Sequence, residues 1–287
     1  MGIDGIWIGL IPLATRWWVK AKRQRIFAAV LYKHPGKVDA IEVLSGRAIQ
    51  GGLLVLQTKP GSDLTINGKK TMVSSQGLAV TGFHRDDTTT LTIQTKHPDG
   101  NTHNLLLKPE IRVYQEQRID GLPRKMVTPP EEVYERIKKE NKLIAKARTI
   151  DSDLDFFKDK FIFPVEDAII TGVYGSQRIL NGKPRWPHYG LDFAKDEGTP
   201  VKAMINGTVT LAEADLYYTG GTLIFDHGHG ISTLYMHMHE IFVEKGQKVK
   251  QGDIIGTVGS TGRATGAHLD IRLNWFDVRI DPATALK

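Results

Sequence analysis

Short β-prone segments, separated by turn-forming residues at intervals of about ten positions, are the feature that most constrains the fold of this chain. Between residues 41 and 110 the clearest turn is Asn67-Gly68, because both residue types tolerate the positive φ of a two-residue hairpin. Strands this short and this regularly spaced predict a small antiparallel β-sandwich. The segments expected to form its strands are 51–57, 64–66, 71–73, 78–83, 89–95 and 103–107.

The same pattern returns at Phe161 and continues toward the last residue, Lys287. Glycine is frequent (29 of 287 residues), aromatic residues make up 8%, and 40% of residues are hydrophobic. This composition favours a β-rich protein with a substantial core over a helical bundle. We therefore expect an antiparallel β domain whose strands include 169–173, 200–204, 207–211, 222–226, 232–235, 254–258 and 268–273.

One helix is expected between the two β regions. The stretch Thr128-Pro129-Pro130-Glu131-Glu132 has the capping residue, prolines and acids typical of a helix start. Val133, Ile137 and Ile144 then share one face up to about Arg148, and this apolar stripe is expected to pack on a neighbouring domain. The chain is thus predicted to be mainly β. Its expected parts are an unassigned N-terminus (1–40), a β module resembling immunoglobulin-like envelope modules (41–110), a linker with a helix at about 131–148 (111–160) and a C-terminal antiparallel domain (161–287).

The first 40 residues combine basic and apolar runs. Gly5–Ala14 is apolar but too short to cross a bilayer. The basic stretch Arg16–Arg25 precedes a second apolar run, Ile26–Tyr32, and Val38-Asp39-Ala40 has the small residues of a cleavage site. This order is that of an export signal, and a misassigned start explains it equally well.

Cysteine is absent, which excludes a disulfide scaffold, a cysteine-ligated zinc site and a cysteine nucleophile. The formal net charge is +6, which suits an anionic partner. The charge comes without a recognition helix, a base-stacking motif or a Cys/His finger, so nucleic acid is not the expected partner. An anionic cell-wall polymer suits the same charge.

Three segments of the C-terminal region carry side chains suited to metal chemistry. His188 and Asp192 lie four residues apart where a turn runs into a strand. Both are zinc-ligand types, although this spacing is also typical of a capped turn. His237 ends an expected strand, and His268 and Asp270 leave the same face of another strand because they stand at i and i+2. Two polar side chains on one face of an apolar strand indicate a site, because burying them without partners is costly.

These segments, and those between them, resemble the lysostaphin-type (LytM-like) zinc metallopeptidases. The resemblance covers nearly all of residues 161–287, and residues 117–123 with the expected helix are similar to proteobacterial members that carry an N-terminal β module. The motifs follow the family's order: Val173-Tyr174-Gly175, His188-Tyr189-Gly190-Leu191-Asp192, Gly198–Ala203, Asn206–Val209, Gly221–Gly228, Leu234–Met238, Val243–Gly256, Gly259–Asp270 and Asp281-Pro282.

The resemblance implies a role for each site residue. His188 and Asp192 match the first two metal ligands, and His237 and His268 match the two catalytic histidines. Asp270 stands where the family usually has a histidine as the third ligand. Aspartate also binds zinc, so the resemblance implies one Zn²⁺ per chain, with other divalent metals open because carboxylates are harder ligands. The alternative is that Asp270 only hydrogen-bonds a neighbour.

The implied activity is metal-assisted hydrolysis of peptide bonds in the stem peptides or cross-links of peptidoglycan, by an endopeptidase of the periplasm or cell envelope. One of His237 and His268 would accept the proton and the other would stabilise the oxyanion, and the sequence does not assign these roles individually. The N-terminal β module would orient the catalytic domain or cover its groove. The alternative function is a weak or inactive wall-binding module that activates an amidase, with envelope amidase or division proteins as partners.

Other histidines, aromatic residues and arginines of the region are expected to be structural or solvated. His227 and His229 occupy a hairpin turn, and His239 lies near the rim. Contact with substrate is the alternative for Trp186, Tyr189, Tyr217, Tyr218, Arg185 and Arg263.

Overall fold

The computed structural model describes residues 40–121 and 127–286. The export signal or misassigned start expected within residues 1–40 therefore lies almost wholly outside the described residues. Strands dominate the described part, which confirms the mainly β prediction. No helix in the described ranges is both long enough and apolar enough to cross a bilayer.

Two sheets packed face to face make up the N-terminal β module. One has the order β1-β2-β5 and the other β4-β3-β6-β7. Leu54 and Leu56 of the first sheet meet Leu64 and Ile93 of the second in a buried core, as the expected sandwich requires. The hairpin predicted at Asn67-Gly68 joins β3 to β4, with φ of 50° and 78° at the two positions. The strands are β1 (Glu42–Gly46), β2 (Leu53–Gln57), β3 (Asp63–Ile66), β4 (Lys69–Thr71), β5 (Leu78–Gly82), β6 (Leu91–Lys96) and β7 (Thr102–Leu107).

Strands β2 and β5 of the first sheet are buried on both faces. Leu54 faces the sandwich core, whereas Leu53, Val55, Leu78 and Val80 join the hydrophobic core of the C-terminal region. This double burial explains why β2 and β5 read as continuous apolar runs rather than alternating ones. The N-terminal module and the C-terminal domain therefore share one apolar core.

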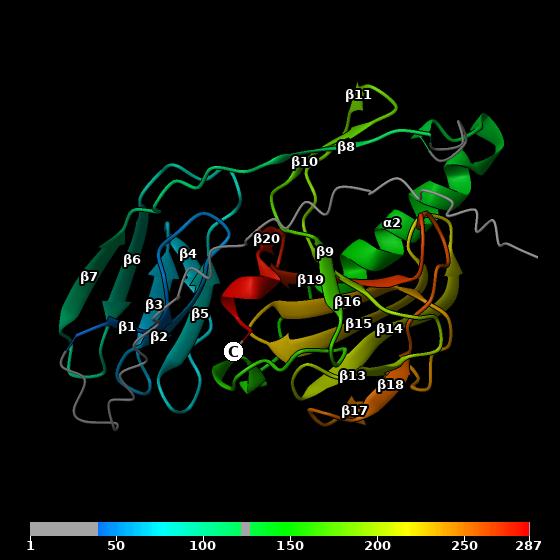
Figure 1. The fold of residues 1–287 in the computed structure, drawn as a ribbon. Helices are drawn as coiled ribbons and strands as arrows, with labels where there is room; N and C mark the ends of the chain where they lie inside the picture. Colours follow the sequence, from blue (N-terminus) through cyan, green and yellow to red (C-terminus); the bar gives the residue numbers. More distant parts are fainter. Residues whose placement is uncertain (1–39, 122–126, 287) are drawn as a thin grey trace, which may run out of the picture. The chain divides into compact units, whose positions relative to one another are not determined.

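An eight-stranded sheet organises the C-terminal region, in the order β17-β14-β15-β16-β19-β12-β9 with β20 paired to β19. Figure 1 shows β14, β15, β16 and β19 running side by side. All pairings in this sheet are antiparallel, as predicted for the domain. Its strands are β9 (Ile169–Gly172), β12 (Leu191–Ala194), β14 (Gly207–Leu216), β15 (Gly220–Gly228), β16 (Ile231–Met238), β17 (Lys248–Val249), β19 (His268–Trp275) and β20 (Val278–Ile280), and a separate pair joins β13 (Pro200–Lys202) to β18 (Ile254–Thr257).

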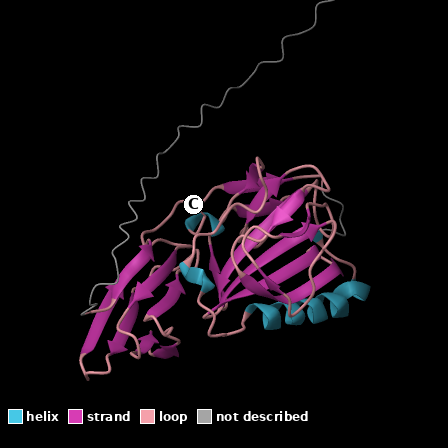
Figure 2. Ribbon diagram, turned by 90° about the horizontal axis from the view of Figure 1, so that it is seen from below, coloured by secondary structure: helices cyan, strands magenta, loops and turns pink. Residues whose placement is uncertain are grey.

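Helix α2 (Tyr134–Arg148) follows the short 3₁₀ turn η1 (Glu131–Val133), close to the predicted bounds. Ile144 and Ala147 pack with Leu211, Ile224 and Leu234 of β14, β15 and β16, so the helix lies along the large sheet (Figure 2). Of the expected stripe, Ile144 makes this contact with the neighbouring sheet.

The expected helix cap at Thr128 is wrong. The extended backbone of Pro130 leads directly into Glu131, and no side chain caps the start. Two further 3₁₀ turns, η2 (Phe156–Lys158) and η3 (Pro282–Thr284), complete the described helical elements.

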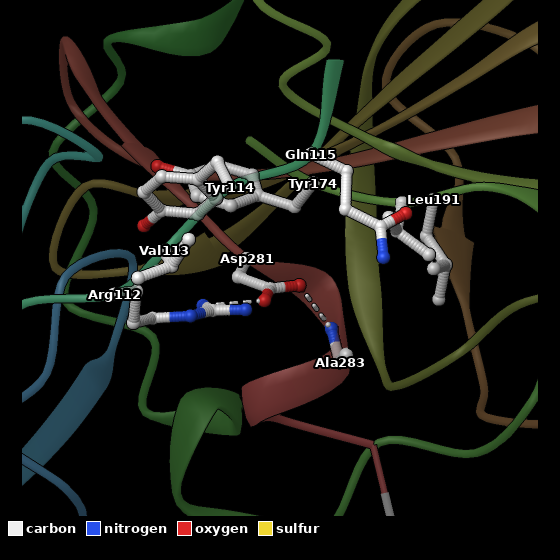
Figure 3. A pocket seen from close by; sticks show the side chains of 9 residues that line it. Arg112, Val113, Tyr114, Gln115, Tyr174, Leu191, Asp281 and Ala283 are labelled. Atoms are coloured by element: carbon white, nitrogen blue, oxygen red, sulfur yellow. Dashed lines mark hydrogen bonds and ion pairs between the residues drawn. The ribbon is translucent and has the colours of Figure 1, made fainter. Parts of the chain in front are cut away.

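The polar segment that follows the sandwich, from residue 111, contains a strand that its sequence does not indicate. Its strand β8 (Glu116–Ile119) pairs in parallel with β10 (Gln177–Leu180), which forms a hairpin with β11 (Lys183–Pro184). Arg112 pairs with Asp281 of the C-terminal region at 2.8 Å, beside a pocket of about 300 Å³ (Figure 3). Strand β8 forms because its backbone pairs with β10, and the pattern of side chains does not reveal such a pairing.

Candidate metal centre

Neighbouring antiparallel strands bring the two candidate carboxylates together. Asp192 of β12 lies directly opposite Asp270 of β19 in the strand register. His188 precedes β12 and is buried, as are both carboxylates. Like charges directly opposite each other on adjacent strands repel, so a cationic partner is required at this point of the sheet.

One imidazole nitrogen lies between the carboxylates. His188 Nε2 is 3.1 Å from Asp192 Oδ1 and 3.4 Å from Asp270 Oδ2. One ligand atom from each of the three residues falls within 4.8 Å of the others. Burial disfavours the charged imidazolium, but the carboxylates of Asp270 and Asp192 outweigh it and raise the pKa of His188. The centre therefore attracts positive charge.

Each carboxylate has one oxygen bonded to an arginine. Arg178 donates to Asp192 Oδ2 at 3.0 Å, and Arg272 donates to Asp270 Oδ2 at 3.1 Å. Burial tends to raise the pKa of Asp270, but Arg272 and His188 together hold that pKa well below its usual range. Asp270 is therefore ionised at neutral pH, as a carboxylate that binds a metal must be.

The remaining donor atoms fit a metal ion. His188 Nε2, Asp192 Oδ1 and Asp270 Oδ1 are buried and have no well-aligned hydrogen-bond partner. Buried polar atoms are rarely left in that state, and an ion is one of the standard explanations. One imidazole and two carboxylates also form a ligand set that zinc accepts. The expectation that Asp270 only bonds a neighbour accounts for Oδ2 but not for Oδ1.

Two glycines leave room for the carboxylates. A Cβ added at Gly172 would overlap Asp192 Oδ2, and one added at Gly190 would overlap Asp270 Oδ1. Gly172 lies opposite Asp192 in the register of β9 and β12, whereas Gly190 lies two residues after His188. The space for each acid therefore depends on the absence of a side chain at these positions.

The two candidate catalytic histidines lie side by side. The rings of His237 and His268 are 4.8 Å apart between centroids. The Nδ1 atom of His237 is 2.8 Å from the Thr261 carbonyl oxygen, and that of His268 is 2.8 Å from the Gly266 carbonyl oxygen. Because a carbonyl oxygen only accepts, Nδ1 carries the proton in each neutral ring and Nε2 keeps its lone pair.

His237, the last residue but one of β16, has a strained left-handed backbone with φ of +64°. A left-handed backbone costs a residue other than glycine about 1–2 kcal/mol, and such strain is characteristic of functional sites. Burial lowers the pKa of His237 to about 4. The ring is therefore neutral near pH 7.

The other histidines of the region have structural surroundings. His227 is fully buried, between the Asn206 carbonyl oxygen and the Thr233 hydroxyl, both at 2.7 Å. His229 is buried 4.8 Å from the ring of Phe157. His239, in contrast, is half exposed and lies 3.3 Å from Glu197.

The aromatic and basic residues expected to be structural or solvated differ in their exposure and in their contacts with the protein. Trp186, two residues before the first ligand, is 83% exposed. Arg185 donates to the Val127 carbonyl oxygen at 2.6 Å, and the guanidinium of Arg263 lies 4.4 Å from the ring of Tyr218. Both arginines therefore have protein partners, which their sequence surroundings did not indicate.

Sequence reasoning missed the residues that support the ligands. Arg178, Arg272, Gly172 and Gly190 all contact Asp192 or Asp270, or leave them space. Arg272 had a usable signal, because its place two residues after Asp270 puts both side chains on one face of β19. Arg178 had none, since β10 was not expected as a strand.

A peptidase family model and a solved peptidase structure match this chain. The model of peptidase family M23 matches residues 186–282, which contain all five candidate site residues. A crystal structure described as a peptidase M23 from Pseudomonas aeruginosa aligns with 84% of this chain and 95% of that chain, with a TM-score of 0.64 and 26% identity. The similarity to that structure therefore extends well beyond the family match.

Two curated relatives match the C-terminal region. Peptidoglycan DD-endopeptidase ShyA of Vibrio cholerae is 43% identical over 101 residues, which are 35% of this chain and 23% of ShyA. DD-carboxypeptidase/endopeptidase Mpg of Neisseria meningitidis is 35% identical over 132 residues, which are 43% of this chain and 30% of Mpg. The chain thus spans less than a third of the length of either relative. Residues 186–282 of this chain form a domain of peptidase family M23, the lysostaphin-type peptidases.

Proposed function

We propose that this protein is a zinc-dependent endopeptidase that hydrolyses peptide bonds in the stem peptides or cross-links of peptidoglycan, in the periplasm or cell envelope. The name of ShyA, a peptidoglycan DD-endopeptidase, supports the substrate class, and the name of Mpg supports endopeptidase activity. The basic balance of the chain, +6, suits an anionic wall polymer.

One observation carries the proposal: three buried ligand atoms converge beside two histidines whose Nε2 atoms keep their lone pairs. His188, Asp192 and Asp270 would hold the metal, which supplies Lewis acidity for amide hydrolysis. Three protein ligands leave a coordination position open, as a catalytic site needs.

His237 and His268 would handle the proton and the developing oxyanion. The neutral ring of His237 can accept a proton at Nε2, while its Nδ1–H stays bonded to the Thr261 carbonyl oxygen. His268 is held in the same tautomer by the Gly266 carbonyl oxygen, so a protonated His268 can donate from Nε2. The two ring centroids lie 4.8 Å apart, and the proton-accepting and oxyanion-stabilising roles are not divided between them.

Digestion of purified sacculi tests the proposal. The wild-type protein should release soluble peptides, and His188→Ala should reduce that release to background because it removes a ligand. His239→Ala is the matched control, since this half-exposed histidine pairs with Glu197 and should leave release unchanged. Full activity in the His188 variant would remove the metal centre from the mechanism.

A wall-binding, amidase-activating module is the second candidate. It is favoured by the arginine pairs, because Arg178 and Arg272 already balance the charges of Asp192 and Asp270. It predicts binding of the wild-type protein to sacculi without peptide release, together with faster hydrolysis by an added amidase.

A further inference from the structure

A single turn fixes the backbone of the candidate ligand His188. Gly175 donates its N–H to the His188 carbonyl oxygen at 2.7 Å, and the N–H of His188 donates to the Ser176 carbonyl oxygen at 2.8 Å. Both backbone hydrogen-bonding groups of the residue are therefore held by residues 175 and 176. Any shift of this turn moves the imidazole relative to Asp192 and Asp270.

The N-terminal module binds the same turn. Arg85, in the loop between β5 and β6, donates from Nε to the Gly175 carbonyl oxygen at 2.7 Å. Its side chain is only 15% exposed, and its guanidinium lies 4.4 Å from the ring centroid of Tyr114. In the same loop, the ring of His84 lies 5.4 Å from that of Tyr189, the neighbour of the ligand.

The turn is also closely covered. Gly175 has φ of +85°, and a Cβ there would overlap the ring of Tyr114. Tyr114 and Tyr174 lie near each other with their rings 6.2 Å apart (Figure 3), and the Tyr174 hydroxyl donates to the Arg279 carbonyl oxygen at 2.7 Å. A glycine has the greatest backbone freedom of any residue, so these contacts are what hold it in one conformation.

We propose that Arg85 is a positioning residue for the metal ligand His188, acting through Gly175, so that the N-terminal module forms part of the metal centre. The proposal rests on the metal-binding function inferred above. Groups that orient a ligand from outside the coordination shell typically change metal affinity roughly 10–100-fold when they are removed. Arg85 belongs to the sandwich, yet it is linked to His188 by two successive hydrogen bonds. Arg85 bonds the Gly175 carbonyl oxygen, and the Gly175 N–H bonds the His188 carbonyl oxygen.

Two substitutions isolate the hydrogen bond. In Arg85→Gln, the amide nitrogen occupies the same place along the side chain as Arg Nε and can donate to Gly175. Arg85→Met has the same length and no donor. Both remove the positive charge and the contact with Tyr114. A difference between them therefore reports the hydrogen bond. Arg112→Met is the control for the junction, because it breaks the ion pair to Asp281 without a bond to the turn.

Zinc affinity, measured by competition with a chelator, is the first readout. We expect Arg85→Met to bind zinc roughly ten-fold or more weakly than wild type, with Arg85→Gln and Arg112→Met close to wild type. Hydrogen exchange at the His188 amide of metal-free protein is the second readout. Exchange should be faster in Arg85→Met than in Arg85→Gln.

Equal zinc affinity in wild type and Arg85→Met would overturn the inference, as would an equal loss in the Met and Gln variants. A wild-type protein that binds no zinc would instead contradict the proposed function. The exchange experiment would then still test the positioning of His188, because it needs no metal. Equal exchange in the two variants would remove Arg85 from that role.

Discussion

At the scale of single residues, charge is the dominant feature of the candidate metal centre. Asp192 and Asp270 are buried opposite each other on neighbouring strands, and each has one oxygen bonded to an arginine and one oxygen without a hydrogen bond. The arginines balance the two acids within the protein. The remaining oxygens, together with His188, offer a place for one more cation.

Gly190→Ala should disable the centre without touching a ligand. The new Cβ would overlap Asp270 Oδ1 and crowd the Ile271 carbonyl oxygen, so the carboxylate must move. We expect zinc retention after dialysis to fall by at least ten-fold. Gly182→Ala is the control for backbone strain without a steric clash, because its φ of +74° disfavours alanine while nothing lies within 4 Å of the added Cβ. Normal retention in the Gly190 variant would show that Asp270 is not held at this place.

His227 should make stability depend on pH. Burial lowers its pKa to about 4, from an ordinary value of 6.5. Because the folded pKa is the lower one, the unfolded chain takes up the proton first as pH falls. The stabilisation is complete above pH 6.5 and is lost between pH 6.5 and about 4.

Urea unfolding of wild type and His227→Gln at pH 7.5 and pH 5 measures this effect. The free energy of unfolding of wild type should fall by about 2 kcal/mol more than that of the variant between these two pH values. An identical pH dependence in both proteins would mean that His227 is not a buried neutral imidazole.

The five candidate site residues could be proposed from the sequence because all of them lie within residues 186–282, which match the M23 family model. Their meeting in space follows from the pairing of β12, β19 and β16. The residues that orient them could not be predicted in the same way. Arg178 contacts Asp192 from a strand that was not expected, and Arg85 contacts Gly175 across 90 residues of sequence, so nothing in their local surroundings indicates these contacts.

At the scale of elements, strands that lie between two cores differ most from expectation. In a strand with one buried face, apolar and polar residues alternate, and this period of two predicts both the strand and its buried face. In β5, however, Ala79 faces the sandwich core while Leu78 and Val80 face the core of the C-terminal domain. The apolar run predicted a strand but did not show which two layers it joins. Helix α2 could be predicted because its apolar residues recur with the helical period on a single face.

Val80→Ala should destabilise the N-terminal module and the C-terminal domain together. The side chain is fully buried in the shared core, and its loss should cost roughly 2–3 kcal/mol through lost burial and a residual cavity. Calorimetry should show one unfolding transition that moves to lower temperature as a unit. Two separate transitions, of which only one shifts, would contradict a shared core.

At the scale of the whole molecule, the shared core and the Arg85 contact bear on the role proposed for the N-terminal module. Of the two roles expected for it, orienting the catalytic domain is the one these contacts favour, because Arg85 and Tyr114 touch the turn that holds His188. The mainly β class and the helix could be predicted from periodicity alone. The fusion of the two cores could not, because it depends on which faces meet in the folded chain.

Metal content of the purified protein, measured by elemental mass spectrometry beside an Asp270→Asn variant, tests the central claim most directly. Asparagine keeps the shape of the side chain but removes the charge that makes it a good ligand. We predict about one zinc ion per chain in wild type and its loss in the variant. A wild-type protein that retains no metal after zinc is supplied would contradict the account and favour the wall-binding module.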